Sequence, residues 1–230
     1  MIPGRRVVPA ACRAVFLLSL FALAPGAQAQ TAATFSVVSE YSLRGLSLSS
    51  GRAEPQLRID QDSSDGWYWG AFGSRVLLRA SPASALAIAY AGYARRLASG
   101  LGWDAGVSRV VFLRDGRSNY LEVYAGISSD RAGARVSLSP HYYGEGRTAY
   151  AEVNGDWPLG ERLRLTGHAG LLHWLQDYGR AARNRIDLRA GLAADIGDFS
   201  VEIGLQARQR DPGLGAARAR ALFASASLGF

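Results

Sequence analysis

The sequence contains no lysine and only one cysteine, Cys12, which precedes an apolar stretch near the N-terminus. We expect Cys12 to be removed with that stretch, so the mature chain offers neither disulfides nor thiol catalysis. No later segment reaches the roughly 18 continuous apolar residues of a membrane-spanning helix. The formal charge of +7 comes from arginines that are scattered along the chain rather than clustered. This scatter argues against nucleic acid as a partner.

Residues 1–29 have the composition of a secretory signal peptide. A basic start is followed by an apolar core at 14–24, and Ala27-Gln28-Ala29 forms an A-x-A cleavage site. The general secretory route is favoured over twin-arginine export, because the residues around Arg5-Arg6 do not support the latter. Loss of the three arginines lowers the formal charge of the mature chain from +7 to +4. An exported chain without a membrane helix either stays in the periplasm or forms an outer-membrane barrel.

Residues 184–208 show the pattern that organises the mature chain. Ile186, Leu188 and Leu192 fall on one face, whereas Arg185 and Asp187 fall on the other. Successive side chains of a strand point to opposite faces, so each segment has one apolar and one polar face. Two such segments joined at Gly197-Asp198 predict a β-hairpin. Each strand has about the 9–11 residues that cross a bilayer at a tilt.

The same alternation predicts about twelve strands, an even number, as single-chain outer-membrane barrels require. The sequence therefore predicts an all-β fold, a transmembrane antiparallel up-and-down β-barrel over residues 30–230, after a cleaved signal peptide. With the N-terminus in the periplasm, the short connections fall on the periplasmic side and the longer ones outside, as barrels prefer. The expected strands are 34–44, 54–62, 66–75, 84–94, 101–111, 118–127, 132–141, 147–157, 161–172, 184–196, 199–208 and 219–230.

Aromatic residues support the membrane interpretation. The chain ends at Phe230 after alternating apolar residues, a pattern that resembles the sorting signal of the outer-membrane assembly machinery. All five tryptophans lie near predicted strand ends, where interfacial aromatic belts are found. The expected partners are therefore the lipid bilayer and the assembly machinery, and the expected location is the outer membrane of a Gram-negative bacterium.

The segment Tyr41-Ser42-Leu43-Arg44-Gly45-Leu46-Ser47, followed by Gly66-Trp67-Tyr68-Trp69-Gly70-Ala71-Phe72-Gly73-Ser74, resembles the opening of the TorF-type porin family. In that family an Arg-Gly-x-Ser turn follows the first strand, and a Gly- and aromatic-rich strand comes soon after. Phe72 stands where the family usually has tryptophan. The resemblance implies a small Gram-negative outer-membrane β-barrel and a pore, without naming a solute.

No motif for catalysis, a metal or a cofactor is found. A barrel lipase or deacylase needs a serine and a histidine side by side, oriented by a third group, and no His-x-Ser-type motif is present. His168 and His173 lack metal-ligand spacing with nearby acids. We therefore expect no enzyme activity, no cofactor and no metal, and we interpret His168 as a polar residue of the lumen.

The inward-facing charges carry the functional prediction. They either interlock and close the lumen or line water. We favour a porin-like channel for passive diffusion of small hydrophilic solutes; the alternative is a closed structural or adhesive barrel that binds through its external loops. Several of the arginines come from successive strands, which predicts an arginine-rich wall that favours anions. The predicted lumen-lining residues are Glu40, Arg44, Arg58, Asp60, Asp104, Glu122, Arg135, Glu152, Asp156, Arg162, Arg164, His168, Arg185, Asp187, Arg189, Asp195, Glu202 and Arg208.

We predict that the mature chain folds only with detergent or lipid, because its strands carry one continuous apolar face. Boiled and unboiled samples should then migrate differently on a gel. A monodisperse, folded protein in plain buffer would contradict the barrel.

Overall fold

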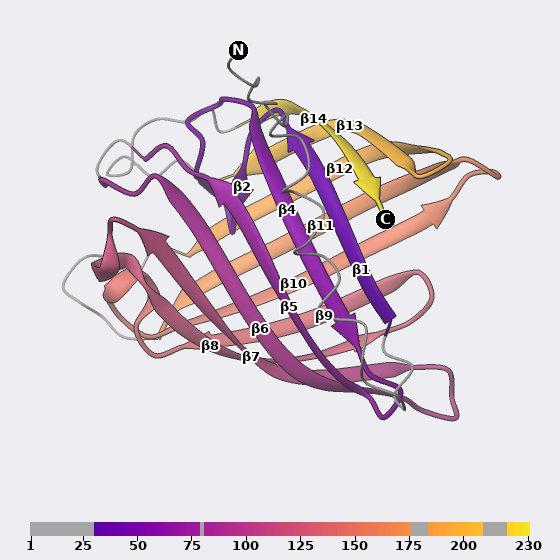
Figure 1. The fold of residues 1–230 in the computed structure, drawn as a ribbon, viewed down its shortest axis with the longest axis horizontal. Coiled ribbons are helices and arrows are strands. Elements are labelled where there is room, and N and C mark those ends of the chain that lie inside the picture. Colours follow the sequence, from indigo (N-terminus) through magenta and orange to yellow (C-terminus); the bar gives the residue numbers. More distant parts are fainter. Residues whose placement is uncertain (1–29, 79–80, 176–183, 209–219) are drawn as a thin grey trace, which may run out of the picture.

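The computed structural model describes residues 30–78, 81–175, 184–208 and 220–230. Within these residues, twelve long strands form a closed antiparallel barrel (Figure 1). The predicted signal peptide, residues 1–29, lies outside the described residues. The barrel strands are β1 (Gln30–Val38), β4 (Glu54–Asp62), β5 (Trp67–Arg75), β6 (Ala85–Arg96), β7 (Gly102–Leu113), β8 (Tyr120–Ser128), β9 (Ala132–Ser139), β10 (Thr148–Pro158), β11 (Leu163–Trp174), β12 (Arg185–Ile196), β13 (Phe199–Arg208) and β14 (Arg220–Gly229).

The predicted fold is confirmed, and strand bounds after the first strand differ from those expected by no more than two residues. Closure depends on β1, which pairs with β4 along its whole length and with β14 from Thr34 to Val38. Backbone bonds between Ala33 and Phe230 extend this second contact. Every strand of the barrel therefore has two neighbours, and the barrel has no open edge.

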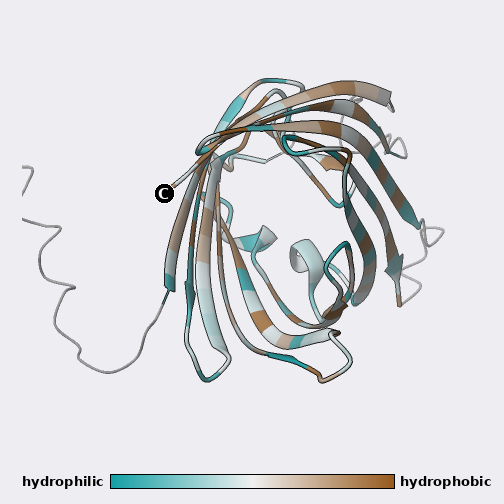
Figure 2. Ribbon diagram, turned by 90° about the vertical axis from the view of Figure 1, so that its right-hand side faces the viewer, coloured by the Kyte–Doolittle hydropathy of each residue, from teal (hydrophilic) through white to brown (hydrophobic). Residues whose placement is uncertain are grey.

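The outer surface of the barrel is apolar. On β8, Ile127 is 60% exposed, whereas the inward-facing Tyr120 is only 1% exposed. The same alternation of polar and apolar residues runs along the strands in Figure 2. Large apolar side chains face outward on eleven of the twelve barrel strands, and the outward row of β6 is mostly alanine; such a surface is unfavourable in water and favourable in lipid.

Short and long connections segregate to opposite ends of the barrel. The turn end carries the short connections, residues 63–66, 97–101, 129–131, 159–162 and 197–198. The loop end carries the longer ones, 39–53, 76–84, 114–119, 140–147, 175–184 and 209–219, of which 79–80, 176–183 and 209–219 lie outside the described residues. This is the division that the sequence predicted for the periplasmic and external sides.

Aromatic side chains gather on the outside of the turn end. Trp67 and Trp103 both contact Tyr93, with ring centroids 5.3 and 5.9 Å apart, and Trp157 is exposed on the same end. Amphipathic rings at this height form the interfacial belt of a membrane barrel. Trp174 departs from this arrangement, because it lies on the inward face of β11 and packs against the buried cluster at the loop end.

The prediction that the first strand reaches residue 44 is wrong. β1 ends at Val38, and residues 39–53 fold back into the barrel; we call this segment the lumenal hairpin. Its tip is the turn at Arg44 (φ 50°) and Gly45 (φ 73°), which joins the short strands β2 (Ser42–Leu43) and β3 (Leu46–Ser47). A positive φ is easily adopted by glycine, so the Arg-Gly pair reverses the chain here instead of continuing the strand.

The loop end of the lumen is filled by an apolar cluster. The lumenal hairpin contributes Tyr41, Leu46 and Leu48, and the short helix η3 (Tyr142–Gly144) contributes Tyr142. They meet inward-facing side chains of the wall, so the inward face is apolar at this end and polar at the other. The remaining buried members are Val76, Ala83, Leu86, Val110, Phe112, Tyr120, Tyr150 and Leu172.

Inward tyrosines pack over inward glycines on neighbouring strands. Tyr68 lies over Gly92, where an added Cβ would come within 2.6 Å of both the tyrosine ring and the Ala105 carbonyl oxygen. Tyr150 covers Gly170 in the same way. Each glycine leaves room for a ring that fills the wall beside it, an arrangement known to support β-sheet glycines.

We predict that Leu192→Arg on the lipid face impairs insertion, because arginine costs about 2–4 kcal/mol at the bilayer midplane. Ser225→Arg is the matched control: residue 225 faces inward, directly opposite Glu202. Folding yield in detergent and in vesicles should fall for Leu192→Arg and stay near wild type for Ser225→Arg. Equal losses in both variants would show that the assignment of faces is wrong.

Candidate functional site

Two cavities formed by the described residues lie next to each other in the lumen. The hairpin cavity, of about 350 Å³, lies between the lumenal hairpin and strands β10–β14. The turn-end cavity, of about 440 Å³, is lined by residues 128–133 and by side chains of β10–β13. Both are lined by Asn154, His168 and Arg189, so these three residues lie at the boundary between the cavities.

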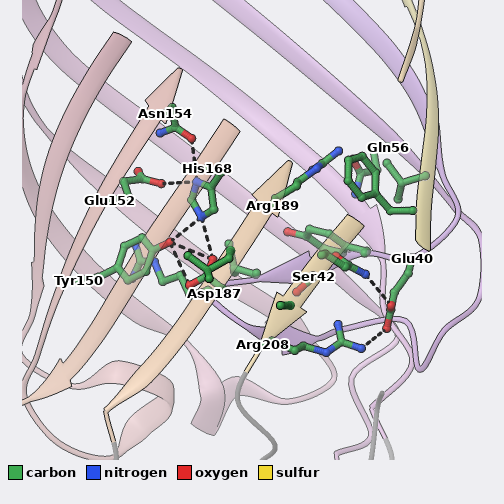
Figure 3. A pocket seen from close by; sticks show the side chains of 18 of the residues that line it. Glu40, Ser42, Gln56, Tyr150, Glu152, Asn154, His168, Asp187, Arg189 and Arg208 are labelled. Atoms are coloured by element: carbon green, nitrogen blue, oxygen red, sulfur yellow. Dashed lines mark hydrogen bonds and ion pairs between the residues drawn. The ribbon is translucent and has the colours of Figure 1, made fainter. Parts of the chain in front are cut away.

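His168, on β11, is held by side chains of the two adjacent strands, β10 and β12 (Figure 3). Its Nδ1 lies 2.7 Å from Asn154 Oδ1, and its Nε2 lies 2.8 Å from Asp187 Oδ2. Tyr150 donates to Asp187 at 3.3 Å and also contacts His168. The Glu152 carboxylate is 3.9 Å from Nδ1. The imidazole is therefore fixed in one orientation at the boundary between the cavities.

Charges in the half of the lumen nearer the turn end are paired and open to water. Arg58 pairs with Asp60 at 2.7 Å, and Arg135 with Asp104 at 2.8 Å. The Arg58 side chain remains 54% exposed. Such exposed pairs contribute little to stability, because water already solvates both partners. They leave a charged, hydrated surface inside the barrel.

On strands β10 to β12, one arginine pairs with two carboxylates. Arg164 pairs with Asp156 at 2.5 Å and with Asp195 at 3.0 Å, and Asp156 is 47% exposed. Arg189 pairs with Glu202 at 3.0 Å while its guanidinium stacks on the Phe223 ring, 3.7 Å from the centroid. The arginines of this wall are therefore matched by carboxylates, so the predicted arginine-rich wall also carries acidic side chains.

At the loop end the ion pairs are dry and they hold the lumenal hairpin. Arg44, at the hairpin tip, forms a bidentate pair with Glu122 of β8; the two side chains are only 10% and 4% exposed. The Arg44 guanidinium also lies 4.5 Å from the centre of the Tyr150 ring. At the base of the hairpin, Glu40 pairs with Arg208 of β13 at 2.7 Å. The hairpin is thus fastened to two separate strands of the wall.

The surroundings of Arg44 and of the η3 tyrosines determine the charge of these side chains. Burial raises the pKa of the Tyr142 and Tyr143 hydroxyls on η3, and the nearby Arg44 guanidinium opposes this rise. Burial alone lowers the pKa of Arg44, but its hydrogen bonds to Glu122 and the surrounding tyrosines raise it overall. The phenols therefore stay neutral and Arg44 stays charged near neutral pH.

The structure distributes the predicted lumen residues among three places. Glu40 and Arg44 belong to the lumenal hairpin rather than to a wall strand. Arg162 lies in the turn between β10 and β11, exposed and outside the wall. The others lie on inward rows of the wall: Arg58, Asp60, Asp104, Glu122, Arg135, Glu152, Asp156, Arg164, His168, Arg185, Asp187, Arg189, Asp195, Glu202 and Arg208.

Sequence reasoning missed the neutral residues of the site. Tyr150 and Asn154 line the hairpin cavity from β10, Gln206 from β13 and Phe223 from β14. Gln206 donates to Glu40 at 2.8 Å and so helps to hold the hairpin. Each shares its strand's inward row with a charged residue or a serine, and this period-2 position could have identified it.

In the described part of the chain, no group of histidine and acidic side chains is arranged to hold a metal ion. Across the same ranges, no helix has the length and apolar character to cross a membrane.

Comparisons with known proteins give a family, and solved structures that share the barrel fold. A family model described as "Bacterial protein of unknown function (Gcw_chp)" matches residues 24–208. The NanC porin structure shares 12% identity with a TM-score of 0.59 and covers 87% of this chain and 98% of its own. The KdgM porin shares 10% identity with a TM-score of 0.57, covering 86% of this chain and 99% of its own; it has also been solved in complex with oligogalacturonate. No curated protein matches the chain.

We predict that Glu122→Gln destabilises the folded barrel by about 3–5 kcal/mol, because it leaves the buried Arg44 charge without its anion. The double variant Arg44→Met/Glu122→Gln should lose less, since no charge is then stranded. Asp130→Asn, which breaks the exposed pair with Arg96, should cost about 0–1 kcal/mol. Unfolding by denaturant in detergent measures all three, and equal losses for the single and double variants would contradict the buried pair.

Proposed function

The chain belongs to the Gcw_chp family of bacterial proteins of unknown function, and for it we propose a porin-like channel that passes small hydrophilic solutes. In this proposal, residues 1–29 are a signal peptide and residues 30–230 are a barrel inserted by the assembly machinery into the outer membrane of a Gram-negative bacterium. The resemblance to the TorF-type porins belongs to the same proposal.

The observation that carries the proposal is the hydrated charge inside the barrel. Between the turn end and His168, the paired inward arginines and carboxylates keep exposed fractions that range from 18% for Asp104 to 54% for Arg58. A barrel that served only as a scaffold would have no need to solvate its interior. Two cavities that share Asn154, His168 and Arg189 supply a polar route to the underside of the lumenal hairpin.

The lumenal hairpin closes this route at the loop end. Its apolar side chains pack against the wall, and its two ion pairs fasten it to β8 and β13. The structure therefore corresponds to the closed state of the proposed channel. Conduction requires the lumenal hairpin to move out of the lumen. This movement breaks the ion pairs of Arg44 with Glu122 and of Glu40 with Arg208.

We infer the solute class from the side chains that line the cavities and not from the ligands of similar structures. The oligogalacturonate of the KdgM complex is an acidic saccharide, and at 10% identity the likeness extends to the fold alone. The lining here mixes carboxylates, arginines and tyrosines, so we assign small hydrophilic solutes without a single sign of charge.

A closed structural or adhesive barrel that binds through its external loops is the second candidate. The filled loop end favours it, because the apolar cluster around Leu48 and Phe112 resembles a permanent core. Catalysis has less support: among the described residues, the hydrogen-bond partners of His168 are Asn154, Asp187 and Tyr150, and no serine, threonine or cysteine is among them.

We predict that replacing residues 40–52 by a short Gly/Ser linker raises single-channel conductance in planar bilayers. The wild type should show rare or small openings, because the hairpin occupies the loop end. The linker variant should conduct steadily through the remaining polar lumen.

Arg52→Gln is the control, since Arg52 is an exposed residue of the same connection. Its conductance should match the wild type. If wild type and linker variant both fold, as judged by heat-modifiable mobility, and neither conducts, the channel is excluded and the closed structural barrel stands.

A further inference from the structure

Arg109 occupies an unusual position on the outer face of the barrel. It lies on β7 between the outward-facing Val107 and Val111, and it is exposed. Its neighbours across the strands are Ala89 and Leu121, both also outward. In the strands that the structure describes, every other outward charged side chain lies within two residues of a strand end.

No carboxylate of the described residues pairs with Arg109. An arginine on the lipid face is costly at mid-depth and tolerated near the interface. Ionisable groups inside a membrane segment usually mark a function, with a partner that neutralises them. Since the described residues supply no partner, an anion that neutralises Arg109 has to come from the surroundings of the barrel.

The position of Arg109 along β7 determines which membrane interface its side chain can reach. Leu113, the last residue of β7, is four residues away, roughly 13 Å along a strand and less along the membrane normal, because the strands tilt. The turn end of β7 is farther, at Gly102. A long arginine side chain extends toward the nearer interface while its stem stays in the apolar region. Ala85, Ala87 and Ala89 form the outward row of β6 beside it and are small enough to leave this route uncovered.

Two further exposed arginines stand at that interface. Arg75 is the last residue of β5 and lies opposite Ala85 of β6, which in turn lies opposite Leu113 of β7. Arg114 follows directly after Leu113. The spacing of two strands places the Cα atoms of Arg75 and Leu113, the residue before Arg114, about 10 Å apart. Asp115, the nearest acid in sequence, is occupied by hydrogen bonds from Ser81 and Ser118. The three arginines thus form a basic patch around the loop end of β7.

We propose that Arg109, together with Arg75 and Arg114, binds the phosphate headgroups of membrane lipids that carry a net negative charge, at the loop-end interface. Phosphate oxygens match the planar donors of guanidinium groups. A lipid headgroup is held at the depth that the Arg109 side chain reaches, whereas a soluble anion is not. This assignment does not depend on conduction through the lumen.

The test compares wild type and Arg109→Gln refolded into vesicles of phosphatidylcholine, with and without phosphatidic acid. Thermal midpoints from gel mobility give stability, and native mass spectrometry gives retained lipid. Phosphatidic acid should raise the wild-type midpoint and bind about fivefold more weakly to Arg109→Gln, the effect expected of roughly one basic residue at an anionic surface. In phosphatidylcholine alone the variant should be at least as stable as the wild type.

Arg58→Gln is the matched control, because it removes an exposed arginine from the lumen and not from the lipid face. It should respond to phosphatidic acid as the wild type does. Arg75→Gln/Arg114→Gln, which leaves the mid-strand lipid face unchanged, should also weaken lipid retention. Equal retention by wild type and Arg109→Gln overturns the proposal. Equal stabilisation by inorganic phosphate added to phosphatidylcholine vesicles overturns the assignment to lipid.

Discussion

Backbone hydrogen bonding governs this structure. In hydrocarbon no water can satisfy an unpaired N–H or C=O group, so strands cross a membrane only as a closed barrel. β1 provides the closure by pairing with β4 on one side and β14 on the other. Once the ring is closed, the period-2 geometry of each strand sends one row of side chains to lipid and the next to the lumen.

The lumen is divided by what fills it. Near the turn end, paired but exposed charges keep the interior hydrated. Near the loop end, the lumenal hairpin brings apolar side chains and two dry ion pairs into the barrel. Loss of one partner of a buried ion pair strongly destabilises a protein, although the intact pair adds little net stability. The two pairs therefore hold the hairpin in one position without being a large source of stability. The boundary falls near His168, which lines both cavities.

The alternation of the sequence was sufficient to predict the closed barrel, its strand number and nearly all strand bounds, because period-2 geometry is local. It was not sufficient for the lumenal hairpin. Residues 39–44 continue to look like a strand, and only the Arg44-Gly45 turn and the long-range pair with Glu122 redirect them. The ion pairs could not be predicted either, because Arg164 is brought to Asp156 and Asp195 by the register of β10, β11 and β12. One signal was present but unused: in the run Val110-Val111-Phe112 both faces are apolar, as expected where the lumen is filled.

The most direct test of the account is whether the lumenal hairpin is buried in the barrel. A chain beginning at Gln30 contains no cysteine, so single cysteines at residues 48 and 52 can be compared by their reaction with a water-soluble thiol reagent. Leu48 is fully buried and Arg52 is exposed, although both belong to the same connection. We predict that Leu48→Cys reacts far more slowly than Arg52→Cys in the folded barrel, and that the two rates become equal after unfolding. Equal rates in the folded barrel would contradict it.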